Sequence, residues 1–420
     1  MSSADHSADV IVVGAGPAGI AAICELLAAG KRVLWVDQNP RPGGQIWRAG
    51  LPPRWAKALA ALEHHPGLRR LSGRAVIAAE GRQLLLQSIA EPAAPALRIE
   101  APQLLLALGA RERFLPFPGW TLPGVHGAGG LQALIKNGWP VAGRTVVLAG
   151  SGPLLLAAAD TARRAGAAVA LVAEQAPLQA LARFTLLQLP LGKFAQALRL
   201  RRGLPYRSGC WVVRALGADK LEAVVLSDGR REWQQPCEAL GLGFGLLPNT
   251  ELAQMLGCRL DAGGAIAVDA GQQSSVAGIY AAGECTGIAG VDKALIEGRR
   301  AALQMLGRSD RSLDRAHGQA LRFGRQLSRH FALRPELFQL AEARTTICRC
   351  EDVCYGELKT QRSGRDAKLQ TRCGMGACQG RICGPITEDL FGWSARSLRE
   401  PLQPAPVASF VERQNASDRP

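Results

Sequence analysis

Six of the eleven cysteines in this chain of 420 residues lie in one short segment near its C-terminal end. They are Cys348, Cys350, Cys354, Cys373, Cys378 and Cys383. Thiolates are soft ligands that suit zinc ions or iron–sulfur clusters. Structural zinc usually takes Cys-x2–4-Cys pairs, a pattern that the Cys348-x-Cys350 spacing fits poorly. The surrounding glycines let the backbone wrap closely and direct N–H groups at sulfur, so the segment favours an iron–sulfur cluster.

A second group of residues suited to chemistry lies near the start of the chain. Gly14-x-Gly16-x-x-Gly19 follows the apolar stretch 10–13 and opens a helix-forming run, and Asp37 comes eighteen residues after Gly19. Gly14 permits a tight turn, Gly16 lets backbone amides approach a pyrophosphate, and Gly19 lets the helix pack closely on the strand. The free N–H groups at the helix start attract phosphates, and Asp37 can accept the hydroxyls of an adenosine ribose. In this context the glycines predict a dinucleotide site rather than a structural turn.

The elements that position this loop recur about 135 residues further on. There, a strand at 144–150 ends in Gly150-Ser-Gly152, a helix follows, and the next strand is closed by Glu174. Leu155 stands where the third glycine belongs, and its side chain would hold the helix away from the strand. Glu174 favours an unphosphorylated ribose, which disfavours NADPH. NADH, ATP and an empty loop all stay open as hypotheses for this site.

Two further motifs point to a particular fold. Pro42-Gly43-Gly44-Gln45 brings more backbone near a diphosphate, and a late strand at 279–282 ends in Gly283-Glu284. With these motifs, residues 8–310 resemble the flavoproteins with two dinucleotide-binding domains, such as glutathione and thioredoxin reductases. In that family the late motif ends in an aspartate that contacts the ribityl chain of FAD. The resemblance therefore implies FAD, with the longer Glu284 in that role. No Cys-x2-Cys or Cys-x4-Cys pair accompanies the flavin motifs, which argues against a disulfide-reductase mechanism.

We expect the motif residues to contact the two nucleotides. The positions expected to bind FAD are Gly14, Gly16, Gly19, Asp37, Gln38, Gly43, Gly44, Gln45, Gly109, Gly283 and Glu284. The positions expected to bind a second nucleotide, NADH or ATP, are Gly150, Gly152 and Glu174. No motif presents a general base, so the catalytic residues stay unassigned.

The cysteine segment, residues 345–392, resembles the small helical 2Fe–2S domain of bacterioferritin-associated ferredoxin. In such domains a Gly-x-Gly turn precedes the third ligand, which implies that Cys378 is a ligand and that Cys354 and Cys373 are bystanders. The implied ligand set is Cys348, Cys350, Cys378 and Cys383.

The predicted fold class is α/β: a flavoprotein with two Rossmann-like dinucleotide-binding domains and a small C-terminal 2Fe–2S domain. The expected limits are 1–120 and 245–310 for the FAD domain, 121–244 for the second nucleotide domain, 311–344 for a helical linker, 345–392 for the 2Fe–2S domain and 393–420 for a loosely ordered tail.

Nearly the whole chain, including the segments 117–125 and 129–132, resembles the larger FAD-containing subunits of heteromeric amine dehydrogenases. That family oxidises opines, proline or D-hydroxyproline, or forms cyanide from glycine. The resemblance implies an electron-relay subunit whose partner is a second flavoprotein subunit carrying the amine-oxidising site, often with a small ferredoxin-like subunit. The alternatives are a subunit of a cyanide-forming glycine dehydrogenase, a stand-alone NADH-dependent flavoprotein reductase and a non-enzymatic scaffold with a zinc module.

Bulk properties exclude other classes of function. The net charge is +15, but the arginines are scattered and no basic block is interleaved with aromatic residues, which argues against nucleic-acid binding. No apolar run reaches the roughly 18–20 residues that a transmembrane helix needs. The polar N-terminal segment lacks the features of a secretory signal. We therefore expect a cytoplasmic protein, with membrane contact only through its electron acceptor.

Overall fold

The computed structural model of the chain describes residues 8–48, 50–187, 191–393 and 398–410. The chain divides into two compact units. The first unit comprises residues 1–111, 247–324 and 397–420, and the second comprises residues 112–246 and 325–396. The chain thus passes between units near residues 111 and 246, not at 120 and 244. The cysteine segment, expected as a separate domain, belongs to the second unit.

A parallel sheet of five strands forms the centre of the first unit, in the order β18–β7–β1–β2–β3. Its strands are β1 (Val10–Val13), β2 (Val33–Asp37), β3 (Leu68–Ser72), β7 (Gln103–Leu106) and β18 (Ile279–Ala281). β1 is apolar and buried at every position, as expected of a parallel strand covered on both faces. Because the strands are parallel, the loops after β1, β2, β7 and β18 leave the sheet at one edge. This edge therefore carries the predicted FAD motifs.

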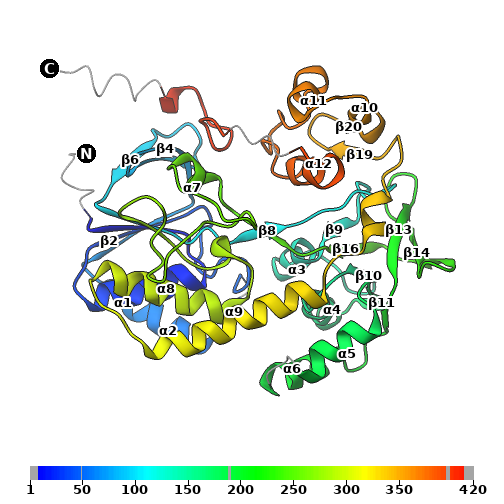
Figure 1. Cartoon of the computed structure of the whole chain (residues 1–420), viewed down its shortest axis with the longest axis horizontal. Helices are drawn as coiled ribbons and strands as arrows, with labels where there is room; N and C mark the ends of the chain where they lie inside the picture. Colours follow the sequence, from blue (N-terminus) through cyan, green and yellow to red (C-terminus); the bar gives the residue numbers. More distant parts are fainter. Residues whose placement is uncertain (1–7, 49, 188–190, 394–397, 411–420) are drawn as a thin grey trace. The chain divides into compact units, whose positions relative to one another are not determined.

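Helices α1 (Pro17–Ala28) and α8 (Val291–Met305) lie beside each other in the first unit (Figure 1). Pro17 starts α1, a position where its missing N–H costs no helical hydrogen bond. A Cβ atom at Gly298 of α8 would lie 2.0 Å from the carbonyl oxygen of Ala18. The two helix backbones therefore touch at this point, which requires a glycine.

The rest of the first unit surrounds this core. Its other elements are the antiparallel sheet of β4 (Arg74–Glu80), β5 (Gln83–Ser88) and β6 (Leu97–Glu100), and α2 (Pro53–Leu62), α7 (Glu251–Met255) and η2 (Glu284–Thr286). Strand β8 (Ala110–Glu112) pairs with β17 (Leu246–Pro248), where the chain passes from one unit to the other. Residues 398–410, from the stretch predicted to be loosely ordered, lie on the antiparallel sheet. The Leu402 amide donates to the Ile77 carbonyl at 2.8 Å, and the Ser409 hydroxyl bonds the Gln87 side chain.

The second unit has the same plan, with a parallel sheet in the order β12–β11–β10–β16–β9. The strands of this sheet are β9 (Val125–Gly127), β10 (Thr145–Gly150), β11 (Ala168–Glu174), β12 (Tyr206–Ser208) and β16 (Ala239–Gly243). The helices of the unit include α3 (Ala128–Lys136), α4 (Leu154–Arg164), α5 (Leu178–Leu187) and α6 (Leu191–Arg201). A separate antiparallel sheet contains β13 (Trp211–Leu216), β14 (Ala223–Ser227) and β15 (Glu232–Pro236). Leu155 is buried in this unit, and its side chain lies where a Cβ atom of Gly243 would be. Gly243, on the neighbouring strand β16, therefore leaves the space that the Leu155 side chain fills, so the loop needs no third glycine.

The cysteine segment completes the second unit (Figure 1). It follows α9 (Ser312–His330), which begins in the first unit, and η3 (Pro335–Gln339). It contains β19 (Thr346–Cys348), β20 (Val353–Cys354), α10 (Tyr355–Lys359), α11 (Gly364–Thr371) and α12 (Cys383–Phe391). The Trp120 indole donates to the Thr346 carbonyl at 2.7 Å, and the Arg113 guanidinium pairs with Asp389. Ile347 and Ile386 lie in the same hydrophobic core as Phe117. The segment is therefore an integral part of this unit.

Candidate cofactor sites

The first glycine loop has the geometry of a dinucleotide site. The Gly14 amide donates to the Val36 carbonyl at 2.8 Å, and Gly14 has a φ of +114°. Asp37 accepts the Ala15 amide at 2.5 Å, which holds the carboxylate against the loop. A Cβ atom at Gly16 would meet no protein atom within 4 Å. Open space thus remains in front of the N-terminus of α1, where a diphosphate is favoured.

The Pro42–Gln45 motif joins this loop in space. The Gly43 amide donates to the Ala15 carbonyl at 2.7 Å. A Cβ atom at Gly44, whose φ is +58°, would lie 2.9 Å from the Gly16 Cα atom. The two motifs therefore form one cradle of backbone, and Gln38 and Gln45 are exposed beside it. Gly109 lies further along, after β7, where its carbonyl accepts the Asn249 amide at 3.1 Å.

The late motif is held by a buried ion pair that the sequence did not indicate. Gly283 packs on the start of α1, since its Cβ atom would lie 3.0 Å from that of Ala18. Lys293 and Glu297 of α8 form a salt bridge of 2.7 Å, with both side chains at most 3% exposed. The Lys293 ammonium also donates to the Gly283 carbonyl at 2.9 Å, and Glu297 accepts the Gly283 amide at 3.0 Å. The pair therefore fixes the turn that carries Glu284.

Glu284 and His317 complete this arrangement. The Glu284 carboxylate accepts the Gly290 amide at 2.7 Å, in the loop that precedes α8. Its burial raises its pKa, while this bond and one from Ala289 lower it. His317 of α9 bonds the second oxygen of Glu297 at 3.0 Å. Burial alone would raise the pKa of Glu297, but His317 and Lys293 bring it below its ordinary value.

In the second glycine loop, the acidic residue Glu174 bonds the backbone of the loop itself. Glu174, 1% exposed, accepts the Gly152 amide at 2.7 Å and the Ala176 amide at 2.9 Å. Its burial raises its pKa to about 7, although these two bonds oppose the shift. The Gly150 φ of +142° keeps the turn of a glycine fingerprint, and its Cβ atom would lie 2.1 Å from the Gly243 carbonyl oxygen. The carboxylate expected to bind a ribose is thus buried inside its own loop.

A segment of the chain itself lies on this loop. We call residues 331–334, between α9 and η3, the capping segment. The Ser151 hydroxyl donates to the Phe331 carbonyl at 2.9 Å, and the Gln175 amide group donates to the Ala332 carbonyl at 3.1 Å. The Arg334 amide returns a bond of 3.2 Å to Gln175, which has no exposed surface. The capping segment therefore occupies the polar side chains of Ser151 and Gln175 beside the glycine loop.

Three of the six clustered cysteines lie together in the fold. The sulfur atoms of Cys348, Cys373 and Cys383 lie within 4.8 Å of one another, and all three residues are buried. The Cys383 thiol and, to a smaller extent, the Cys350 thiol lower the pKa of Cys378. Cys354 stands apart, with its thiol directed at the Arg344 carbonyl. The structure thus places Cys373, predicted as a bystander, among the clustered thiols.

Cys285, next to the late motif, is unsuited to redox chemistry. All cysteines in the described part of the chain are free. Cys285, which follows Glu284, is fully buried and directs its thiol at the Leu106 and Ala282 carbonyls, both at 3.3 Å. Burial raises the pKa of Cys285 to about 11, so its thiol stays protonated at neutral pH.

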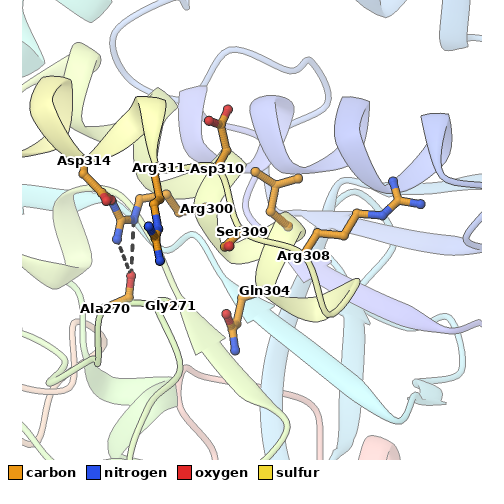
Figure 2. Close-up of a pocket in the computed structure, with 10 residues that line it drawn as sticks. Ala270, Gly271, Arg300, Gln304, Arg308, Ser309, Asp310, Arg311 and Asp314 are labelled. Carbon is orange, nitrogen blue, oxygen red and sulfur yellow. Dashed lines mark hydrogen bonds and ion pairs between the residues drawn. The ribbon is translucent and has the colours of Figure 1, made fainter.

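A surface pocket of about 250 Å³ in the first unit lies outside these sites (Figure 2). The Arg300 guanidinium crosses it to the Ala270 carbonyl at 2.7 Å and to Asp314, also at 2.7 Å. Its lining includes none of the glycine-loop residues or cysteines. The pocket is therefore no part of the predicted cofactor sites.

The fold and the first glycine loop together define an FAD-dependent oxidoreductase with two dinucleotide-binding domains, as the sequence predicts. The chain belongs to the pyridine nucleotide-disulphide oxidoreductase family, whose sequence model matches residues 8–305. The predicted fold class is confirmed. Among the described residues no helix combines the length and the apolar character needed to cross a membrane.

Several relatives match almost the whole chain. The A subunit of opine oxidase from Rhizobium meliloti is 35% identical, over 96% of this chain and 99% of the relative. Hydrogen cyanide synthase subunit HcnB of Pseudomonas protegens is 33% identical, over 96% and 97%. L-proline dehydrogenase from P. horikoshii is similar in structure, with a TM-score of 0.66 at 18% identity over 96% of this chain and 79% of that chain. T. acidophilum thioredoxin reductase gives a TM-score of 0.58 at 21% identity over 72% and 98%.

Proposed function

We propose that this chain is the FAD- and iron–sulfur-containing electron-transfer subunit of a heteromeric dehydrogenase that oxidises an amino or imino acid. One observation carries the proposal: an open dinucleotide loop and a buried cluster of three thiols occur in a chain that is similar over 96% of its length to an opine oxidase subunit. Substrates of the D-hydroxyproline, proline or opine type would be oxidised by a second flavoprotein in the complex. In such a complex, a small ferredoxin-like protein would assist electron transfer.

The residues present fit both cofactors. Asp37 would hold the adenosine ribose of FAD, and the amides of the Gly14–Gly19 loop would hold its diphosphate. The predicted set Cys348, Cys350, Cys378 and Cys383 would provide the four soft thiolate ligands that iron–sulfur clusters take, and two of its members, Cys348 and Cys383, lie in the buried group of thiols. When bound, FAD would exchange electrons in pairs and the cluster singly, so that together they would couple a two-electron oxidation to a one-electron acceptor. The chain's own part is to hold both groups and keep water from the buried thiols.

A subunit of a cyanide-forming glycine dehydrogenase is the second candidate, because HcnB and the opine oxidase relative are about equally similar to this chain. The substrate distinguishes the two proposals. We expect the complex with its flavoprotein partner to reduce an artificial acceptor with proline, D-hydroxyproline or an opine. Activity with glycine alone, with release of cyanide, would favour the second candidate.

The isolated chain gives a direct test of the relay role. We expect the anaerobically purified protein to contain FAD, iron and acid-labile sulfide, and its flavin to stay oxidised when the amine is added without the partner. Adding the flavoprotein partner should then bleach the flavin. Rapid bleaching by amine alone would contradict a relay role, and absence of iron and sulfide would contradict the cluster.

The second loop yields a separate prediction. Because the capping segment occupies Ser151 and Gln175, we expect no saturable binding of NADH or ATP below about 1 mM, the upper end of ordinary substrate affinities. NADH should therefore leave the flavin oxidised over minutes. Titration of NADH fluorescence and of flavin absorbance measures both effects. Micromolar binding or fast bleaching would instead favour a stand-alone NADH-dependent reductase.

A further inference from the structure

We propose that one face of helix α9 is the docking surface for a small acidic electron-carrier protein. The inference deepens the proposed function and rests on it in one respect, namely that this chain exchanges electrons with another protein. The face is defined by four arginines, which we call the arginine stripe: Arg315, Arg322, Arg325 and Arg329.

Helix geometry places these four side chains on one face. α9 is a single uninterrupted helix over Ser312–His330 (Figure 1). The arginines are seven, three and four positions apart, spacings that return to the same face of a helix. At about 3.6 residues per turn, they fall within an arc of about 80° and extend along about 21 Å of the helix axis. Residues that look scattered in the sequence thus form one line of positive charge.

The opposite face of α9 is packed against the first unit. The His317 ring bonds the buried Glu297 carboxylate at 3.0 Å, and a Cβ atom at Gly324 would lie 2.5 Å from that of Ala289. Both residues lie about 140–160° around the helix from Arg322. The arginine stripe therefore points away from this packing, and all four of its residues are exposed.

The arginines of the stripe have no acidic partner within the part of the chain that the structure describes. On helix α8, by contrast, Arg299 pairs with Glu25 at 2.5 Å and Arg300 pairs with Asp314 at 2.7 Å. Asp314 is the single acidic residue of α9, so this bond already uses it. A line of unpaired guanidinium groups beside a helix whose arginines are paired indicates complementarity to an external surface of negative charge.

The composition of this face identifies the class of partner. In the described part of the chain, the exposed large apolar side chains all lie outside α9. Obligate subunit interfaces have an apolar core, and a helix that lies in a membrane surface buries large apolar side chains, so this face fits neither. Short-lived encounters between redox proteins bury little area and are steered by opposite charges. A small protein with an acidic face is therefore the partner that the stripe fits.

The inner contacts of α9 suit a site of electron exchange. His317 bonds Glu297, and Glu297 accepts the Gly283 amide in the turn that carries Glu284. That turn belongs to the predicted FAD site. A carrier bound on the stripe would therefore lie on the outer face of the helix whose inner face supports this turn.

Matched charge-neutral variants of the full chain, loaded with its cofactors, test the docking surface. The probe is an oxidised 2Fe–2S ferredoxin with a negative net charge, and fluorescence anisotropy measures its dissociation constant at ionic strengths of about 0.01 M and about 1 M. The stripe variant combines Arg315→Gln, Arg322→Gln and Arg329→Gln. The control variant removes three exposed positive charges elsewhere, through Lys220→Gln, Arg230→Gln and Arg259→Gln.

Both variants lower the net charge equally, so they separate the stripe from the charge of the whole protein. We expect the stripe variant to bind ferredoxin at least about tenfold more weakly at low ionic strength and to lose most of the salt dependence. The control variant should stay within about twofold of the parent, because its charges lie outside the docking surface. FAD content and circular dichroism report folding in each variant.

Arginine labelling of the unmodified protein keeps the proposal testable if a variant fails to fold. Bound ferredoxin should protect the four arginines of the stripe from phenylglyoxal and leave Arg230 and Arg259 labelled. Equal weakening in both variants, binding that does not depend on salt, or full labelling of the stripe in the complex would overturn the proposal. Stripe-dependent binding of single-stranded DNA or of phosphatidylserine vesicles, without binding of ferredoxin, would also overturn it.

Electron transfer is a separate readout that distinguishes this proposal from the proposed function. The photoreduced chain should give one electron to the ferredoxin cluster, with no bond formed or broken. Stripe-dependent binding without this transfer would support the docking surface and contradict the relay function. Transfer at equal rates in the parent and both variants would support the relay function and contradict the docking surface.

Discussion

Replacing Lys293 with methionine is expected to destabilise the first unit by about 3–5 kcal/mol, the cost of leaving a buried carboxylate without its cation. Lys293 and Glu297 are 2% and 3% exposed at their side chains, so water cannot take over the lost interaction. The Gly283 carbonyl and the Thr286 hydroxyl also lose their bonds to the ammonium. We therefore expect weaker FAD retention as well, because these groups belong to the turn that presents Glu284.

Urea unfolding followed by circular dichroism measures the first effect, and FAD released on dilution measures the second. Arg299→Met is the matched control in the same helix, because Arg299 pairs with Glu25 at 2.5 Å with side chains 44% and 30% exposed. Such a surface pair contributes only about 0.2–1 kcal/mol. The double variant Lys293→Met with Glu297→Gln should regain part of the stability, since no charge stays buried. Equal losses in Lys293→Met and Arg299→Met would refute the role of burial.

Acid should weaken the same pair. The pKa of Glu297 is held below its ordinary value in the folded protein. A carboxylate with a lowered pKa contributes stability above its unfolded pKa and loses it as the pH falls through its folded pKa. We therefore expect the difference between parent and Glu297→Gln to be largest at neutral pH and to shrink below about pH 4.3, the ordinary glutamate value. An unfolding midpoint series at several pH values checks this sign.

Gly14→Ala and Gly16→Ala are expected to remove FAD for different reasons. At Gly14, with a φ of +114°, the new methyl group would lie 2.2 Å from the Ala107 carbonyl oxygen. Backbone strain of about 1–3 kcal/mol and overpacking of similar size should lower stability by roughly 2–6 kcal/mol. FAD would be lost because the loop cannot keep its shape.

Gly16→Ala should remove FAD without destabilising the loop, unlike Gly14→Ala. Its φ of −79° suits alanine, and a Cβ atom there meets no protein atom within 4 Å. We therefore expect Gly16→Ala to fold with a stability within about 0.5 kcal/mol of the parent, as for other unstrained substitutions. Its FAD content should nevertheless fall, because the methyl group fills space that the diphosphate needs. Retention of FAD by Gly16→Ala, measured by absorbance after gel filtration, would show that the open space is not the diphosphate site.

The backbone shape of the first glycine loop can be predicted from the sequence because its requirements are local. Gly14 must adopt a positive φ, Gly16 must leave room, and Asp37 must end the next strand. Each condition involves residues within one strand–helix–strand unit, so it leaves a recognisable spacing. The fold class follows from the repetition of that unit and is confirmed by the family match and the similar structures.

The tertiary structure alone decided three features, because they depend on contacts between distant residues. Lys293 and Glu297 have the spacing of an ordinary surface pair, and only the packing of α8 on α1 and α9 buries them. The capping segment lies on a loop about 180 residues earlier in the chain, a contact that no local pattern encodes. Cys373 is one of several thiols in the sequence, and only the fold places its sulfur within 4.8 Å of those of Cys348 and Cys383. Residue types thus define which chemistry is available, and chain folding determines which of those residues meet.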